Sequence, residues 1–196
     1  MPFLPLEPNA FPDTLFGEDN DDVRDGRVWW VLHTRPRQEK SLARQLHQGR
    51  VPFYLPLIER RSVIRGRVLE SHVPLFPGYL FLLGVRDERL AALATKRVVH
   101  SLEVSDQQGL WNDLIQVNRL INTGAPITPE ERLEPGDLVE ITRGALAGLK
   151  GRIIRAASGR RFVVQVNFIQ RGASVLLDDF NLSAIDEDLA EPVNRN

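Results

Sequence analysis

The stretch "VPLFPGYLFLL" at residues 73–83 constrains the fold most, because it gathers Phe76, Tyr79 and Phe81 around a Pro-Gly corner. In a strand that begins at Tyr79, alternate side chains point to opposite faces, so Tyr79 and Phe81 share one face and the leucines between them take the other. One apolar face can pack against the domain's own helices. The other is either a second core layer or a docking surface, since exposed apolar patches mark interfaces.

Short strands and short helices alternate between residues 27 and 123, which predicts an α+β domain whose helices pack against an antiparallel sheet. Apolar runs rich in β-forming residues predict strands at 28–34, 51–58, 79–85 and 97–104, and a hairpin over 59–73 that turns at Arg65-Gly66. Helical spacing of apolar residues predicts helices at 37–50, 87–95 and 110–122.

The remaining segments differ in character. Five short β-rich runs separated by glycine-bearing turns predict a small all-β barrel at residues 134–187. The valines of its central run and its many glycines favour strands over helices, so we expect this barrel to be stable. Residues 124–133 carry Gly, Pro and acidic residues and predict a linker, and 188–196 a tail. Residues 1–26 predict an acidic, mostly disordered arm.

The formal net charge of −1 hides an uneven distribution of charge. The net charge is −6 over residues 1–26, +7 over residues 27–123 and −2 over residues 124–196. The middle region is therefore the one suited to a polyanion. The chain has no cysteine and no apolar run long enough for a membrane span, so we expect a cytoplasmic protein. No motif for nucleophilic, metal or phosphate-loop chemistry is present, so we expect neither an enzyme nor a cofactor or metal.

Three motifs occur in one order along the chain: "WWVLHTRPRQEK", "PLFPGYLFL" and "GDLVEITRGALAGLKGRI". Together they resemble the NusG family of transcription elongation factors. The resemblance implies an NGN domain at residues 27–123, followed by an SH3-like KOW barrel at 134–187. It also implies an elongation or antitermination factor that binds RNA polymerase, suppresses pausing or termination, and recruits a second partner through the KOW domain. "VIRGR" before "PLFPGYLFL" looks more like the specialised RfaH-like paralogues than the housekeeping NusG.

The resemblance also implies where a monomer of this family would bind its partners. Docking on the clamp helices of the large polymerase subunit would involve His33, Phe76, Tyr79 and Phe81. Phe76 and Phe81 could equally be plain core. The non-template DNA strand would lie beside Arg35, Arg37, Lys40, Arg44, Arg65, Arg67, Lys96 and Arg97. An ordinary solvated basic face is the alternative for each of these cations.

For the C-terminal region, the resemblance implies that Rho or a small-subunit ribosomal protein binds at Leu146, Phe168, Ile169 and Arg171. Phe168 could instead be the last inward residue of its strand. Two further interpretations of the whole chain stay open: the housekeeping NusG, and a ribosome-associated or RNA-binding KOW protein.

Overall fold

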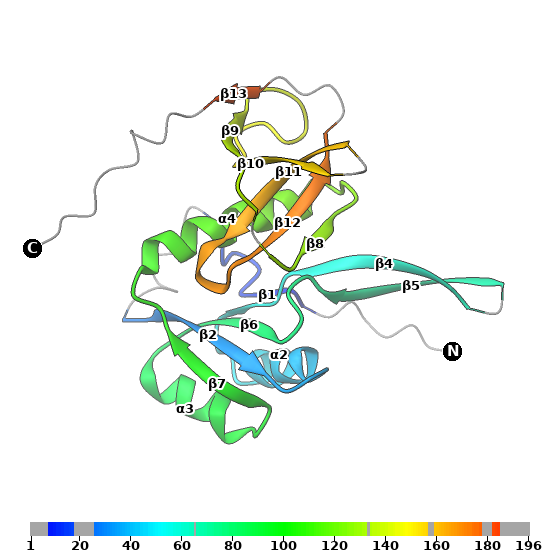
Figure 1. The fold of residues 1–196 in the computed structure, drawn as a ribbon. Helices are drawn as coiled ribbons and strands as arrows, with labels where there is room; N and C mark the ends of the chain where they lie inside the picture. The colour runs from blue at the N-terminus through cyan, green and yellow to red at the C-terminus, as the bar shows by residue number, and fades with distance from the viewer. Residues whose placement is uncertain are drawn as a thin grey trace, which may run out of the picture. The chain divides into compact units, whose positions relative to one another are not determined.

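The computed structural model describes residues 8–17, 26–64, 66–132, 134–156, 159–177 and 182–184. The chain divides into two compact units, residues 1–112 and 113–196, and the division falls within the long helix α4 (Gln107–Asn122). Each unit is described by itself below (Figure 1).

A five-stranded antiparallel sheet forms the framework of the first unit. Its strands, from one edge to the other, are β1 (Ala10–Phe11), β3 (Phe53–Tyr54), β6 (Tyr79–Gly84), β2 (Val28–Thr34) and β7 (Val98–Glu103). The two most apolar strands, β6 and β2, lie at the centre and pair from Val28 with Gly84 to His33 with Tyr79. The mixed α/β fold expected from the sequence is confirmed for this unit.

Helices α2 (Glu39–Gln48) and α3 (Arg86–Ala94) accompany one face of the sheet (Figure 1). Leu42, Ala43 and Leu46 of α2 belong to one buried cluster with Leu32, Leu80 and Leu82 of the central strands. Full burial of each leucine contributes about 1.5–3 kcal/mol, so this spacing of apolar residues fixes the helix on the sheet. Helix α2 starts two residues later than expected, because Arg37 adopts a left-handed conformation with φ 62°.

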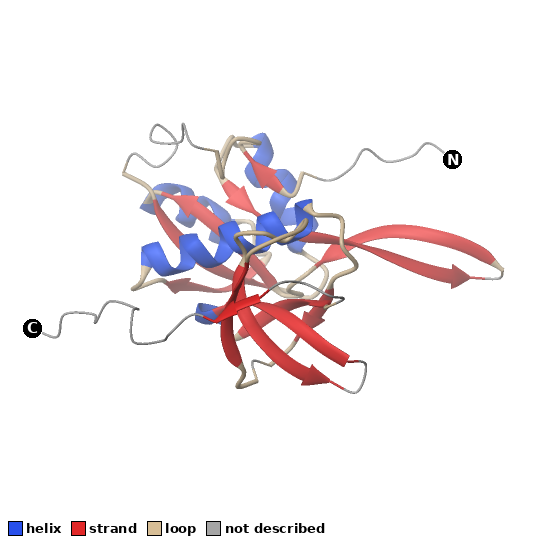
Figure 2. Cartoon of the chain, turned by 90° about the horizontal axis from the view of Figure 1, so that it is seen from above, coloured by secondary structure: helices blue, strands red, loops and turns tan. Residues whose placement is uncertain are grey.

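Strands β4 (Leu57–Ile64) and β5 (Arg67–Pro74) form a separate two-stranded hairpin, seen as a long ribbon in Figure 2. Ile64 pairs with Arg67, and Gly66 lies in the turn between the strands, where the sequence predicts one; Arg65 lies outside the described residues. Gly66 has φ 74°, a conformation that glycine adopts without steric cost.

Residues 8–17 of the N-terminal arm are part of the first unit, whereas the sequence predicts a mostly disordered arm. Strand β1 extends the sheet by pairing with β3, and the Leu55 amide donates to the Asn9 carbonyl at 2.6 Å. Leu15 is completely buried. The arm therefore gains an edge strand and an apolar anchor that its composition does not reveal. Residues 1–7 and 18–25 lie outside the described residues.

The described strands of the second unit, which follow α4 in the chain, form a six-stranded antiparallel sheet. The order is β13 (Leu182–Ala184), β9 (Asp137–Ile141), β10 (Lys150–Ala156), β11 (Gly159–Val166), β12 (Arg171–Leu176) and β8 (Thr128–Glu130). The expected all-β character of this region is confirmed. Strand β8 lies in the segment predicted to be a linker. It is held there because Glu130 accepts from buried Ser174 and pairs with Arg161 at 3.3 Å.

Candidate functional site

The sheet face opposite α2 and α3 carries a row of aromatic rings that crosses four neighbouring strands. This aromatic row consists of Tyr54, Phe81, Tyr79, His33 and His100. The ring centroids of Tyr54 and Phe81 lie 6.4 Å apart, those of His33 and Tyr79 lie 5.4 Å apart, and those of His33 and His100 lie 6.3 Å apart. Cross-strand pairing places these side chains on one face because paired residues of an antiparallel sheet point the same way.

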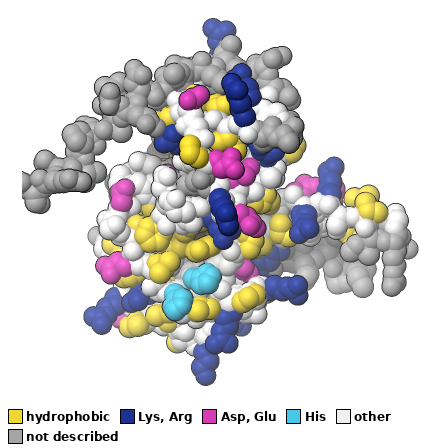
Figure 3. All heavy atoms as spheres, viewed as in Figure 1, with side chains coloured by type: hydrophobic (Ala, Val, Ile, Leu, Met, Phe, Trp, Pro, Cys, Tyr) yellow, Lys and Arg dark blue, Asp and Glu magenta, His cyan; other side chains and the backbone are white. Residues whose placement is uncertain are grey.

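One end of the row is open to solvent. We call it the open end and define it as His33, Tyr79 and His100 of the row, together with Leu102, which lies on the same face of β7 as His100. His33 and Tyr79 are half-buried, His100 is exposed, and Leu102 is 40% exposed. Figure 3 shows two adjacent histidine side chains among hydrophobic atoms, in agreement with the stacking of His33 and His100. The open end can therefore offer a partner both apolar contact and hydrogen-bonding groups.

The other end of the row is covered, which corrects part of the docking prediction. Phe81 is fully buried and Phe76 is 1% exposed, with their rings edge to face at 6.4 Å. The Pro-Gly corner that follows Phe76 is a tight turn, since the Tyr79 amide donates to the Phe76 carbonyl across it at 3.1 Å. Both phenylalanines are thus core residues. Of the four predicted anchors, His33 and Tyr79 keep an accessible side chain.

A buried carboxylate positions the corner next to the open end. Glu39, only 5% exposed, accepts a hydrogen bond from the Gly78 amide at 2.8 Å. Gly78 has φ 87°, its carbonyl accepts from the Thr34 amide at 2.8 Å, and an added Cβ would lie 3.5 Å from the His33 ring. Glu39 was not predicted as a site residue, because its only signal in the sequence is its place in the first turn of an amphipathic helix. His100 and Leu102 were not predicted either, because nothing in the sequence of strand β7 distinguishes them from other residues of an exposed edge strand.

Two loops bring three of the predicted basic residues together. The Arg35 amide donates to the Arg97 carbonyl at 2.8 Å, so the loop after β2 lies against the loop after α3. Arg35, Arg37 and Lys96 are exposed there, and we call them the basic loops. Arg97 is half-buried, and its guanidinium donates to Gln45 at 2.9 Å, so it links the loop to α2.

The other predicted cations do not join this group. Arg44 is exposed on α2, while half-buried Lys40 donates to the His72 carbonyl and ties α2 to the hairpin. Arg65 lies outside the described residues, as does the side chain of Arg67. In the same hairpin, the hydrogen bond and charge of Glu59 raise the pKa of Arg61, which lies 2.8 Å from it.

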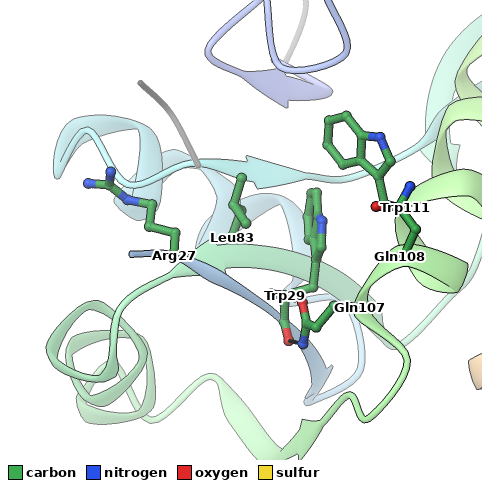
Figure 4. Close-up of a pocket in the computed structure, with 6 residues that line it drawn as sticks. All are labelled: Arg27, Trp29, Leu83, Gln107, Gln108 and Trp111. Atoms are coloured by element: carbon green, nitrogen blue, oxygen red, sulfur yellow. Dashed lines mark hydrogen bonds between the residues drawn. The ribbon is translucent and has the colours of Figure 1, made fainter. Parts of the chain in front are cut away.

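A cavity of about 200 Å³ lies on the same side of the sheet as the aromatic row. Figure 4 shows its lining: Arg27, Trp29, Leu83, Gln107, Gln108 and Trp111. Its polar groups have partners within the protein, because Arg27 pairs with Glu88 at 3.0 Å and Gln107 exchanges two hydrogen bonds with the Trp29 backbone. The cavity thus belongs to the packing of α4 on β2.

In the second unit, two of the four predicted partner-binding residues are buried. Leu146 is 2% exposed and Ile169 is 9% exposed, so neither presents its side chain to a partner. Leu146 turns inward because the Leu149 amide donates to its carbonyl and closes the loop before β10. Phe168 and Arg171 are half-buried around the short helix η1 (Asn167–Ile169).

Two further observations concern only the described residues. No group of three or more His, Cys, Asp or Glu side chains gathers there in a metal-binding arrangement. None of the described helices is long and apolar enough to cross a membrane.

Comparison with family models adds an independent finding. The model described as "NusG: Transcription termination factor nusG" matches residues 27–130, which is more than half of the 196 residues. The match includes the sheet strands β2, β3, β6 and β7, the three helices and the hairpin, and it begins after the N-terminal arm. It thus contains the open end and the basic loops, and the chain belongs to the NusG family of transcription factors.

Proposed function

We propose that this protein is a transcription elongation or antitermination factor that binds RNA polymerase through the open end of its aromatic row. Proteins of the NusG family generally bind RNA polymerase, and residues 27–130 carry the family's domain. The observation that carries the proposal is the exposed Leu102 beside half-buried Tyr79 and His33, on a sheet face whose remainder is covered. Aromatic side chains with a polar tip are favoured anchors at interfaces.

The partner surface in this proposal is the pair of clamp helices of the large polymerase subunit. A factor that binds the closed polymerase more tightly than the paused form shifts the population toward the closed form. Pausing and termination are then suppressed without any covalent chemistry. The protein acts as a monomer in the cytoplasm.

The basic loops supply the second contact, with the non-template DNA strand. Arg35, Arg37 and Lys96 are exposed within two adjacent loops, and clustered cations attract phosphates through counterion release. Their number sets the expected salt dependence. Each substitution that removes one cation–phosphate contact makes the negative slope of log K against log salt shallower by roughly one unit or slightly less.

The C-terminal unit is proposed to be an SH3-like KOW barrel that recruits Rho or a small-subunit ribosomal protein. Its described strands form one antiparallel sheet, and Phe168 and Arg171 remain partly accessible at one turn. The "VIRGR" segment of the hairpin favours a specialised RfaH-like role over the housekeeping one.

Two leucines of similar exposure test the docking face. Leu102 in the open end is 40% exposed, and Leu90 on α3, on the opposite side of the sheet, is 47% exposed. We expect Leu102→Ala and Tyr79→Ala to weaken binding of the full chain to purified core polymerase by about tenfold each, a typical cost for an interface anchor. Leu90→Ala should bind as the unchanged protein does. Equal effects of the two leucine changes would refute the site, and binding to RNA without polymerase would favour an RNA-binding KOW protein.

A further inference from the structure

The arm formed by residues 8–17 covers one end of the aromatic row. The ring of Phe16 meets the ring of Tyr54 edge to face, with 4.7 Å between centroids and 82° between planes. It also contacts Trp111 of α4 at 5.4 Å, and neighbouring Leu15 is fully buried. These contacts place the Phe16 ring of the arm over Tyr54.

The hydroxyl of the covered residue, Tyr54, lacks a hydrogen bond among the described residues. Its side chain is completely buried, and its hydroxyl has no hydrogen-bond partner within the described residues. A buried polar group without a partner costs about 1–3 kcal/mol. The covered state therefore carries the free-energy cost of this unpaired hydroxyl. A hydrogen bond from the hydroxyl to water, or to an acceptor on a partner, would remove that cost.

The covered end is continuous with the open end. Tyr54 stacks on Phe81, and Phe81 stands two residues before Leu83 and two after Tyr79 on the same face of β6. Displacing Phe16 would thus uncover the Tyr54 end of the row without moving a sheet strand.

The arm is attached on both sides of the sheet, which allows one side to release. Phe11, in β1, packs edge to face against His47 of α2 at 4.9 Å, on the helix-covered side. Phe16 packs on the opposite side, with Pro12 and the turn after it between them. Both attachments lie outside residues 27–130, which the family model matches.

We propose that residues 12–17 are a displaceable cover that holds the docking face partly closed, and that RNA polymerase displaces Phe16 and engages Tyr54. This proposal rests on the proposed function. The occupant is the same polymerase surface, because the covered and open ends form one row. The apparent affinity for polymerase is then reduced by the fraction of molecules in which the cover is in place.

The test uses two phenylalanines of one arm as a matched pair in the full chain. Phe16→Ala removes the contact with Tyr54, whereas Phe11→Ala removes a contact on the other side of the sheet. We expect Phe16→Ala to lower the apparent Kd for core polymerase by about three- to tenfold, in proportion to the open fraction that it creates. Phe11→Ala should leave the Kd within about twofold of the unchanged protein if it stays folded. Circular dichroism and thermal unfolding verify the fold of each variant.

A third variant tests whether the arm has only a structural role. Tyr54→Phe removes the unsatisfied hydroxyl, so it should favour the covered state and raise both the unfolding temperature and the apparent Kd. If Phe16→Ala binds polymerase no more tightly than Phe11→Ala, or Tyr54→Phe does not weaken binding, the cover is only structural and the proposal fails. Loss of binding in Tyr79→Ala alone would then leave the proposed function intact. If no variant binds polymerase, both proposals fail.

Discussion

The ring of Phe16 stands edge-on to the ring of Tyr54 at a centroid distance of 4.7 Å, although 37 intervening residues separate them in the chain. This contact makes an acidic N-terminal segment part of the NusG-family domain that follows it. It also leaves the Tyr54 hydroxyl buried without a partner among the residues that the structure describes. The stability of the domain and the extent of the proposed docking face therefore depend on the same pair of rings.

Tyr54→Phe is expected to stabilise the first unit. The substitution removes a buried hydroxyl to which no described residue offers a hydrogen bond, and the free energy of unfolding should rise by about 1 kcal/mol or more. Urea unfolding of the full chain, followed by the fluorescence of Trp29, Trp30 and Trp111, measures this change. A loss of stability would show that the hydroxyl makes a favourable interaction in solution.

Tyr54 should also make the free energy of unfolding depend on pH in the alkaline range. Burial raises the pKa of Tyr54 above its ordinary value of 10.0. The unfolded chain therefore loses this proton before the folded chain does, so the tyrosine's contribution to stability is complete below pH 10 and falls as the pH rises above it. Unfolding curves between pH 9 and about 11.5 should show less loss of stability in Tyr54→Phe than in the unchanged protein.

Glu39→Ala should disturb the corner that positions Tyr79. The change leaves the Gly78 amide without its acceptor, at a cost of about 1–3 kcal/mol. Glu39→Gln keeps an acceptor oxygen and should cost less. Thermal unfolding compares the two, and polymerase affinity should fall in the same order. Equal effects of both variants would mean that the charge of Glu39, rather than the hydrogen bond, matters.

Lys96→Gly should raise the stability of the protein and weaken its binding to nucleic acid. Lys96 follows helix α3 with φ 59°, a left-handed conformation that costs a residue with a Cβ roughly 1 kcal/mol or more. Glycine should therefore raise the unfolding temperature while it weakens binding to single-stranded DNA and lowers the salt slope by roughly one unit or slightly less. Lys96→Gln is the control, since it removes the charge and keeps the strain.

Gly151→Ala should destabilise the second unit far more than Gly148→Ala. An added Cβ at Gly151 would lie 2.4 Å from the Val163 carbonyl oxygen and 2.8 Å from the Phe162 ring. We expect a loss of about 3 kcal/mol or more, because neither the strand nor the core can move aside cheaply. Gly148 has open space but φ +81°, so alanine there should cost only about 1 kcal/mol. Circular dichroism of the full chain during urea unfolding compares the two variants.

The elements of this fold were readable where local chemistry decides them. The seven residues of β2 match the predicted strand 28–34 because the run is β-branched and aromatic and ends before Pro36. The hairpin turn at Gly66 was readable because glycine accepts a positive φ. Helix α4 begins at Gln107, three residues before the expected start, because the Asp106 side chain accepts from the Gly109 amide.

Which face each aromatic ring occupies was also determined by the sequence, since the alternation in β6 puts Tyr79 and Phe81 on one side. How far each ring is buried was decided only by tertiary structure. Phe81 is covered and Tyr79 is partly open, because Phe76 packs on Phe81 while Tyr54 and Phe16, from segments distant in the chain, pack at that end of the row. Periodicity is a local property, whereas burial is the sum of contacts between segments far apart in the chain. For that reason the family was evident from the sequence, and the packing of the N-terminal arm on the sheet was not.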